Sequence, residues 1–310
     1  MTGASGFAGS HLLEHLIQFE PSVAAWRNPH GQPPSIADTR IAWHAVDLLD
    51  RSAVADALAE LQPASIYHCG GVADVGGSWS NPARALRVNA MGTHHLLEGV
   101  RAAGLSCPIL VIGSALVYRP SADPISEDSA IGPTSPYGVS KLAQEMLALA
   151  TTVAPTVVAR PFNHAGPRQA PDYVTSSFAR QIVEIEREMA APVLRVGNLD
   201  SRRDLTDVRD VVRAYRLLAR NGRPGRIYNV CSGISHRVGD ILEMLVALAG
   251  VRVTIAQDST RMRPSDNPVV LGDRARILAE VGWEPEIPID RTLADLLGYW
   301  RQRLASRPAS

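Results

Sequence analysis

The chain has 310 residues, of which 45% are apolar, and its 31 lysines and arginines balance 31 aspartates and glutamates. This apolar content is enough for one or two packed cores, and it excludes a disordered chain. A chain without net charge lacks the basic surplus that releases counterions from nucleic acid, so we expect no nucleic-acid partner. A local anion pocket stays possible.

The sequence has no run of about eighteen apolar residues and no apolar segment after a basic N-terminus, so we expect neither a membrane span nor a signal peptide. We therefore predict a cytoplasmic protein without a membrane partner. Its three cysteines lack CxxC spacing, which argues against a disulfide framework or a structural zinc site and favours buried thiols.

Short apolar runs alternate with helical patterns through the first half of the chain. The runs at 23–26, 41–46, 65–68 and 109–112 are typical of buried strands, and the patterns at 7–17, 51–61 and 82–103 are typical of helices. Strands that alternate with helices predict a mostly parallel sheet covered on both faces, which is the doubly wound (Rossmann) α/β architecture.

After residue 160 the pattern loosens into a proline-rich loop, which predicts a smaller C-terminal α/β lobe for the substrate. Helices are predicted from Val174 and over 208–218, 238–248 and 293–304, with a strand over 226–230. We expect a cofactor-binding domain over 1–160 and a substrate lobe over 161–305. Residues of about 204–232 return to the first domain, and 306–310 form a tail.

A glycine-rich turn opens the sequence, with Gly3, Gly6 and Gly9 spaced as G-x-x-G-x-x-G ahead of the first helix. Such a turn lets backbone N–H groups approach a pyrophosphate at a helix N-terminus. The predicted dinucleotide-binding residues of this turn are Gly3, Ser5, Gly6, Phe7, Ala8 and Gly9. The motif normally follows a buried strand of about five residues, so we expect most of the first strand to lie upstream of Met1.

The choice of dinucleotide is predicted from the end of the next strand, where NAD-specific enzymes usually carry an acid that binds the ribose. Arg27 stands there instead and suits the 2′-phosphate of NADP, so we favour NADP(H) over NAD(H). Asp47 and Leu48 follow the predicted strand at 41–46 and are expected to border the adenine, although an aspartate there also suits a simple turn.

A second motif carries proton chemistry. Tyr137 and Lys141 are four residues apart, so they share one face of a predicted helix. A phenol with an ordinary pKa near 10 is a poor acid or base at neutral pH, and Lys141 can lower that pKa by stabilising the phenolate. Ser114 follows the strand at 109–112, where it can hold a substrate oxygen.

These features together resemble the extended short-chain dehydrogenase/reductase family of the NAD-dependent epimerase/dehydratase type. The glycine turn, the segment Val88-Asn89-x-x-Gly92-Thr93, Ser114 and the Tyr137-x-x-x-Lys141 motif carry the resemblance, which reaches to about Leu304. It implies an NAD(P)-dependent oxidoreductase with Ser114, Tyr137 and Lys141 as catalytic residues and with Asn89, Tyr137 and Lys141 at the cofactor. It also implies a homodimer.

The segments at 160–169, 178–186, 196–199, 203–210, 228–233 and 263–265 are similar to one branch of that family. This branch holds the GDP-mannose 4,6-dehydratases and the GDP-4-keto-6-deoxy-D-mannose reductases. The resemblance implies a GDP-sugar substrate, and the chemistry that it implies needs no metal. The substrate-binding residues that it implies are Ser114, Asn163, Val174, Asn198, Arg203 and Arg263.

A 4,6-dehydratase needs an extra acid after the catalytic serine, whereas Ala115 and Leu116 cannot transfer a proton. We therefore disfavour dehydration and expect NADPH-dependent reduction of the C4 ketone of GDP-4-keto-6-deoxy-D-mannose to GDP-D-rhamnose. An NAD-dependent sugar-nucleotide 4-epimerase and a non-catalytic nucleotide-binding relative remain as alternatives. The residues leave the stereochemistry at C4 open.

Overall fold

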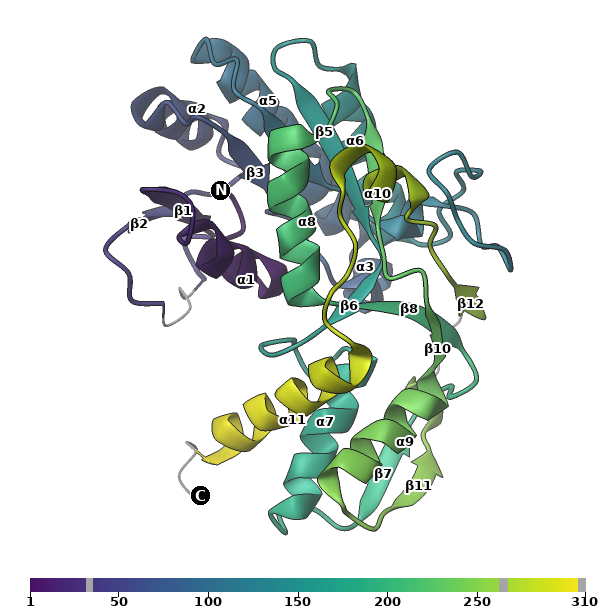
Figure 1. The fold of residues 1–310 in the computed structure, drawn as a ribbon. Helices are drawn as coiled ribbons and strands as arrows, with labels where there is room; N and C mark the ends of the chain where they lie inside the picture. The colour runs from purple at the N-terminus through teal and green to yellow at the C-terminus, as the bar shows by residue number, and fades with distance from the viewer. Residues whose placement is uncertain (32–35, 262–266, 306–310) are drawn as a thin grey trace.

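The computed structural model describes residues 1–31, 36–261 and 267–305. Its centre is a parallel sheet in the order β3-β4-β5-β9, and β1 and β2 form a second parallel pair (Figure 1). This is the predicted Rossmann-like architecture. The strands are β1 (Val23–Arg27), β2 (Ile41–Ala45), β3 (Ile66–His68), β4 (Ile109–Ile112), β5 (Thr156–Pro161) and β9 (Ile227–Val230).

The first residues of the chain lie between the two sets of strands. Thr2 N donates to Tyr67 O at 3.0 Å on one side, and Trp26 N donates to Met1 O at 2.8 Å on the other. Thr2 also forms an isolated parallel bridge with His68. These bonds connect β1 to β3 at the place where the first strand is expected, and the expectation of an upstream strand stays a prediction.

The four-stranded sheet is buried on both faces because its side chains alternate. On β4, Ile109 and Val111 pack into one core with α2 and α5, whereas Leu110 packs into the opposite core with α1 and α8. The covering helices are α1 (Phe7–Leu16), α2 (Arg51–Leu61), α5 (Gly92–Ala102), α6 (Pro136–Ala150) and α8 (Val208–Asn221). The sheet therefore leaves only its strand ends free for a ligand.

The predicted helical stretch over 82–103 is confirmed, since the chain is helical without a break from Pro82 to Ala102. The stretch consists of α4 (Pro82–Leu86), the π-helix η1 (Arg87–Met91) and α5, and a short helix α3 (Val75–Ser80) precedes it. A π-helical turn holds one more residue than an α-helical turn, which changes the direction of the side chains within it. As a result Asn89 is fully buried.

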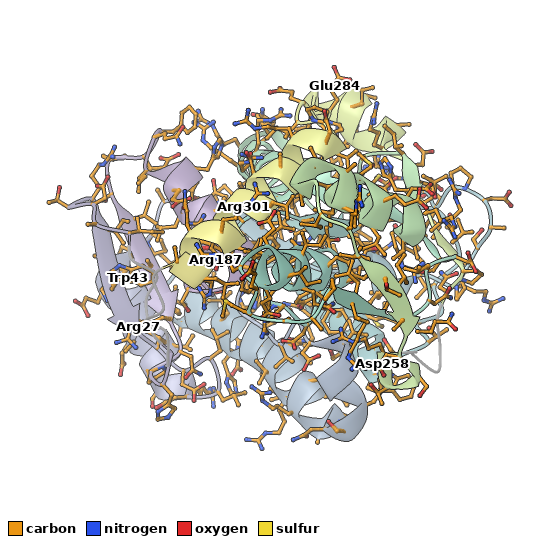
Figure 2. All side chains as sticks on the ribbon, turned by 90° about the horizontal axis from the view of Figure 1, so that it is seen from below. Arg27, Trp43, Arg187, Asp258, Glu284 and Arg301 are labelled. Carbon is orange, nitrogen blue, oxygen red and sulfur yellow. The ribbon has the colours of Figure 1, made fainter. Side chains whose placement is uncertain are left out.

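The second lobe packs three helices against a two-stranded parallel sheet, at the lower end of Figure 1. Trp300 and Leu293 on the last helix are buried against Phe178 of α7. Where α7 and α11 meet, the Arg187 guanidinium donates a hydrogen bond to the backbone oxygen of Arg301 at 3.1 Å; both residues are labelled in Figure 2. The elements are α7 (Val174–Glu186), β7 (Val193–Val196), α9 (Val238–Ala249), β11 (Thr254–Gln257) and α11 (Ile289–Ala305).

A small sheet joins the lobes. Its central strand β8 pairs with three others in this sheet, of which β6 comes directly after β5. Because β8 runs straight into α8, the lobe is tied to the helix that covers the main sheet. The strands are β6 (Asn163–Ala165), β8 (Arg202–Asp207), β10 (Ser235–Arg237) and β12 (Val269–Val270). A 3-10 helix, η3 (Ser259–Arg261), lies between β11 and β12 in the chain.

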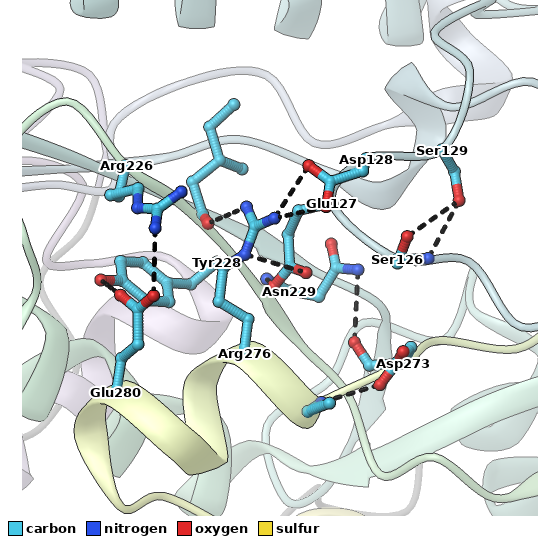
Figure 3. Close-up of polar contacts among 12 residues, drawn as sticks. Ser126, Glu127, Asp128, Ser129, Arg226, Tyr228, Asn229, Asp273, Arg276 and Glu280 are labelled. Atoms are coloured by element: carbon cyan, nitrogen blue, oxygen red, sulfur yellow. Dashed lines mark hydrogen bonds and ion pairs between the residues drawn. The ribbon is translucent and has the colours of Figure 1, made fainter.

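The chain returns to the first lobe a second time at α10 (Ala275–Val281). Ile277 and Trp283 are buried in the core of α1 and α8. Figure 3 shows the polar contacts of this return, where Arg276 binds Asp128 at 2.8 Å and Arg226 binds Glu280 at 3.3 Å. The domain boundary at 160 stays a prediction, and α10 lies beyond the returning segment that the sequence indicated.

Candidate active site

A cleft of about 1630 Å³ lies between the carboxyl ends of the sheet strands and the second lobe. Its described lining holds eight arginines and Lys141 against three acids, Asp47, Asp172 and Glu184. A chain with no net charge thus concentrates positive charge in one cavity, as an anionic ligand with several phosphates requires. Figure 2 shows Arg27, which lines the cleft, far from Asp258, the partner of the cleft residue Arg261.

The glycine turn lines the cleft with all six of its predicted residues. Gly3 has φ 67°, which favours glycine, and a Cβ there would lie 2.7 Å from the backbone of Cys69. A Cβ at Gly9 would lie 2.0 Å from Gly3 O, so α1 can begin this close to the turn only with glycine. The resulting cradle of backbone at a helix N-terminus fits a pyrophosphate.

Arg27, Asp47 and Leu48 also line the cleft, at the ends of β1 and β2. The Arg27 guanidinium donates to Gly31 O at 2.8 Å and to Pro29 O at 3.1 Å, so the following loop holds it in place. Asp47 accepts from Leu49 N at 2.9 Å, which is the turn contact that the sequence left open. A cation fixed at this edge is suited to a 2′-phosphate.

Asn89 does not line the cleft, in contrast to the other cofactor residues that the sequence indicated. Its side chain accepts from Val72 N at 2.8 Å and donates to Ser140 Oγ at 2.8 Å. A Cβ at Gly71 would lie 2.6 Å from Asn89 Oδ1. Asn89 therefore holds the loop after β3 against α6, behind the wall of the cleft.

Ser114 lies in the cleft directly after β4, with Ala115 and Leu116 beside it. Its Oγ accepts from Leu116 N at 3.1 Å, so the hydroxyl keeps its proton to donate, and the side chain also contacts Tyr137. Ala115 and Leu116 make this part of the wall apolar.

Tyr137 is placed by the start of α6. Ser135 caps the helix by accepting from Gly138 N at 3.1 Å, and Pro136 occupies the first turn. A Cβ at Gly138 would lie 2.4 Å from Leu116 O, so the glycine lets α6 approach the segment that carries Ser114. The glycine that follows Tyr137 in the motif is therefore required for the packing of α6 against this segment.

The Tyr137 side chain is almost fully buried, and burial raises its pKa above the ordinary value of a phenol, although the Ser114 hydroxyl acts in the opposite direction. We expected Lys141 to lower this pKa. Desolvation of the phenolate by burial is instead the dominant effect. Tyr137 is therefore a protonated phenol at neutral pH, which is the form that an acid needs.

Lys141 is the one lysine in the sequence, the remaining basic residues among the 31 being arginines. Lys141 Nζ donates to Ile112 O at 2.9 Å and to Gln144 Oε1 at 2.8 Å. Burial lowers its pKa to about 8.

The second lobe contributes four of the predicted substrate residues to the cleft, namely Asn163, Val174, Asn198 and Arg203. Arg203 donates to Asn267 O at 2.8 Å, whereas its neighbour Arg202 binds Ser235 outside the cleft lining. Alternation along β8 explains why only one of the two arginines faces the cavity. Arg263 lies outside the described residues.

Further arginines of the cleft were not indicated by the sequence. They come from separate segments and share no motif, so only the fold brings them together. Arg261 donates to Ser177 Oγ at 3.0 Å and pairs with Asp258. The additional cleft arginines are Arg84, Arg87, Arg168, Arg180, Arg195 and Arg261.

Arg168 connects the two sides of the cleft by a bidentate contact. Its guanidinium donates to both carboxylate oxygens of Glu14 on α1, at 2.6 and 2.5 Å. Arg168 has φ 73°, a left-handed conformation that favours glycine. This backbone explains why glycine suits the position, and the bond to Glu14 explains what the arginine adds.

Over the described ranges, no group of three or more His, Cys, Asp and Glu side chains is arranged to hold a metal ion. None of the helices in these ranges combines the length and the apolar composition that a membrane span requires.

The cradle, the cleft and the Ser, Tyr and Lys side chains define an extended short-chain dehydrogenase/reductase fold. The chain belongs to the GDP-mannose 4,6 dehydratase family, whose model matches residues 1–296. It is 38% identical to the GDP-6-deoxy-D-mannose reductase of Pseudomonas aeruginosa over 98% of this chain and 97% of the relative.

A solved structure of RMD from Pseudomonas aeruginosa complexed with NADPH is similar to this chain, with a TM-score of 0.85 and 37% identity over 97% of both chains. The chain is also 24% identical to a GDP-mannose 4,6-dehydratase of Vibrio cholerae, over 96% of this chain and 91% of the relative.

Proposed function

We propose that this protein is an NADPH-dependent reductase that converts the C4 ketone of GDP-4-keto-6-deoxy-D-mannose to the alcohol of GDP-D-rhamnose. The observation that carries the proposal is the 38% identity to a GDP-6-deoxy-D-mannose reductase over nearly the whole length of both chains. The side chains for carbonyl reduction, Ser114, Tyr137 and Lys141, all line one cleft.

The residues present fit a dinucleotide phosphate. A Cβ at Gly3 or Gly9 would collide with backbone, so the turn offers the bare cradle that a pyrophosphate occupies. Arg27 supplies the cation for the 2′-phosphate, and no acid replaces it at the end of β1. NADPH, when bound there, supplies the hydride for C4.

Each catalytic side chain has one task. Tyr137 donates its phenol proton to the oxygen of C4, which becomes the hydroxyl of the product. Ser114 donates a hydrogen bond to the same oxygen and polarises the ketone. The Lys141 ammonium supplies positive charge beside the phenolate that Tyr137 becomes, because it lies one helical turn away on the same face.

A 4,6-dehydratase activity is disfavoured although the family carries that name. Dehydration needs a proton donor beside the catalytic serine, and Ala115 and Leu116 occupy that place. Of the three acids in the described lining, Glu184 is paired with Arg180 at 2.7 Å and Asp47 accepts from Leu49 N. An NAD-retaining 4-epimerase is disfavoured by Arg27.

A homodimer is part of the proposal. Neighbouring segments around α6 expose large apolar side chains, including Val139, Met146, Met91 and Leu86. Exposed apolar side chains grouped on one face favour association. The expected outcome is a dimer mass in solution, and Met146→Glu is expected to convert it to a monomer.

We place the reaction in the cytoplasm. The three cysteines are free thiols, a pattern that suits a reducing compartment. Burial raises the pKa of Cys69 to about 12, so this thiol in the cleft is protonated and unreactive at neutral pH.

The direct test follows the absorbance of NADPH with GDP-4-keto-6-deoxy-mannose and, because dehydration and epimerisation consume no NADPH, follows GDP-mannose and UDP-glucose by chromatography of the products. A reductase consumes NADPH with the keto-sugar and leaves GDP-mannose and UDP-glucose unchanged. Conversion of GDP-mannose would instead identify a dehydratase, conversion of UDP-glucose an epimerase, and no reaction a non-catalytic relative. NMR of the product then distinguishes the rhamnose from the talose epimer at C4.

A further inference from the structure

Behind Lys141 a continuous set of hydrogen bonds runs through the protein core. Gln144 Oε1 accepts from Lys141 Nζ at 2.8 Å, and Gln144 Nε2 donates to Thr93 Oγ1 at 3.0 Å. His68 Nε2 lies 2.8 Å from the same Thr93 oxygen, and His68 Nδ1 lies 2.8 Å from Thr2 Oγ1. Gln144, Thr93 and His68 are fully buried.

The chemistry of the donors allows only one direction for these bonds. An ammonium has no lone pair, so Gln144 must accept with its oxygen and present its NH₂ group to Thr93. Thr93 donates its proton to Asn89 O at 2.7 Å, so its oxygen accepts from both Gln144 and His68. His68 therefore carries its proton on Nε2.

The series ends beside the glycine turn. His68 Nδ1, without a proton, accepts from the Thr2 hydroxyl, and Thr2 Oγ1 accepts from Gly70 N at 2.9 Å. Burial lowers the pKa of His68 to about 3, so the ring is neutral at physiological pH and this tautomer is the only one that satisfies both of its neighbours. The network is thus a fixed frame rather than a proton store.

The frame determines how Lys141 faces the cleft. Of the three ammonium protons, one is bound by Ile112 O and one by Gln144, and Lys141 lines the cleft with the third. We infer that Gln144, held in place by Thr93 and His68, is a positioning residue that fixes the direction and the protonation state of the Lys141 ammonium. The inference rests on the proposed function for its kinetic consequence only.

Three titratable groups near Lys141 are neutral at physiological pH. Cys69, which follows β3, and His68 face it from the sheet, and Tyr137 lies one turn back on α6. Glu145 on the next turn is buried in a pair with Arg160. Burial lowers the pKa of Lys141 to about 8. If Gln144 positions the ammonium as inferred, a change at Gln144 is expected to move this value, because Gln144 Oε1 accepts directly from Lys141 Nζ.

The single lysine makes a direct measurement possible. In protein labelled with ¹³Cε-lysine, the one signal reports the titration of Lys141 without any assignment. We expect Gln144→Glu to raise the pKa of Lys141 by about one unit, because a carboxylate stabilises the ammonium, and Gln144→Met to lower it. Gln62→Glu on the exposed end of α2 is the matched control and leaves the pKa unchanged.

The kinetic arm uses the same variants. With Gln144→Met we expect kcat to fall about tenfold with an unchanged KM for the GDP-sugar, and the alkaline limb of the pH profile to move to lower pH. With Gln144→Glu that limb moves to higher pH. Thr93→Val is expected to lower kcat and to move the alkaline limb to lower pH, as Gln144→Met does. Thr93→Ser is expected to keep the wild-type pH profile because it keeps the hydroxyl.

The lysine titration and the kinetics together distinguish a failure of the proposed function from a failure of the positioning role. If the wild-type protein does not reduce the keto-sugar, the proposed function fails while the lysine titration still tests the positioning role. If both Gln144 variants keep the wild-type pKa of Lys141 and only melt at lower temperature, Gln144 is a packing residue and the inference is wrong.

Discussion

The two walls of the cleft hold their polar groups in different ways. On the cofactor wall, Lys141 and the residues behind it are buried and bonded in one fixed arrangement. On the substrate wall, the arginines belong to several separate elements, and Arg261 is held by Ser177 and by the partly exposed Asp258. A buried, bonded wall suits the alignment of reacting atoms, whereas several guanidinium groups around one cavity suit diphosphate binding. Substitutions on the first wall should therefore change kcat, and those on the second should change KM.

The largest effect is expected at Tyr137. Tyr137→Phe removes the proton donor and keeps the ring that fills the buried site, so kcat should fall by about 10²–10⁴-fold while the KM for the GDP-sugar changes little. Steady-state kinetics with NADPH measures both values, and an unchanged melting temperature verifies the fold. A variant that retained most of its kcat would show that another group supplies the proton.

The opposite pattern is expected at Arg203. Arg203→Ala should raise the KM for the GDP-sugar about tenfold or more with a smaller change in kcat, because a hydrogen bond to a charged group contributes about 1.5–3 kcal/mol. Arg202→Ala is the matched control, since it removes the same charge on the neighbouring position of β8 outside the cleft lining. Equal effects of the two substitutions would mean that general charge, rather than this contact, sets affinity.

Arg27 tests the cofactor end of the first wall. Arg27→Ala should lower kcat/KM for NADPH about tenfold and leave the value for NADH nearly unchanged, since only NADPH carries the 2′-phosphate. Arg40→Ala, at the opposite end of the β1–β2 pair, should leave the ratio of the two cofactors unaltered. A parallel loss with both cofactors would assign Arg27 to the folding of its loop.

The smallest effect is expected at Arg168, which joins the two walls. Arg168→Gly relieves a left-handed backbone but breaks the partly exposed pair with Glu14, so the free energy of unfolding should change by less than about 1 kcal/mol. Glu14→Gln breaks the pair alone and should lower it. Thermal or denaturant unfolding of both variants measures the difference, and a loss of several kcal/mol in Arg168→Gly would show that the pair dominates.

Most of the fold and of the candidate site could be predicted from short stretches of sequence. The glycine turn and the Tyr137 to Lys141 motif could be recognised because each depends on residues within one turn or one helix. The helical pattern over 82–103 was equally clear, but the π-helical turn at Arg87–Met91 within it was not, because Asn89 in this turn bonds Val72 and Ser140, which are distant in the sequence. Strand β5 was not predicted from the sequence because it ends in Pro161, which is unusual in a strand that pairs on both sides.

The sequence by itself determined the class of the protein and indicated Tyr137 as its candidate acid, together with Ser114 and the single lysine. Only the tertiary structure decided that Arg203 rather than Arg202 faces the cleft, that scattered arginines share one cavity, and that Gln144 holds Lys141. The physical reason is distance along the chain. Helical spacing and turns act between near neighbours, whereas charge in a cleft and hydrogen bonds in a core join residues that only folding brings together.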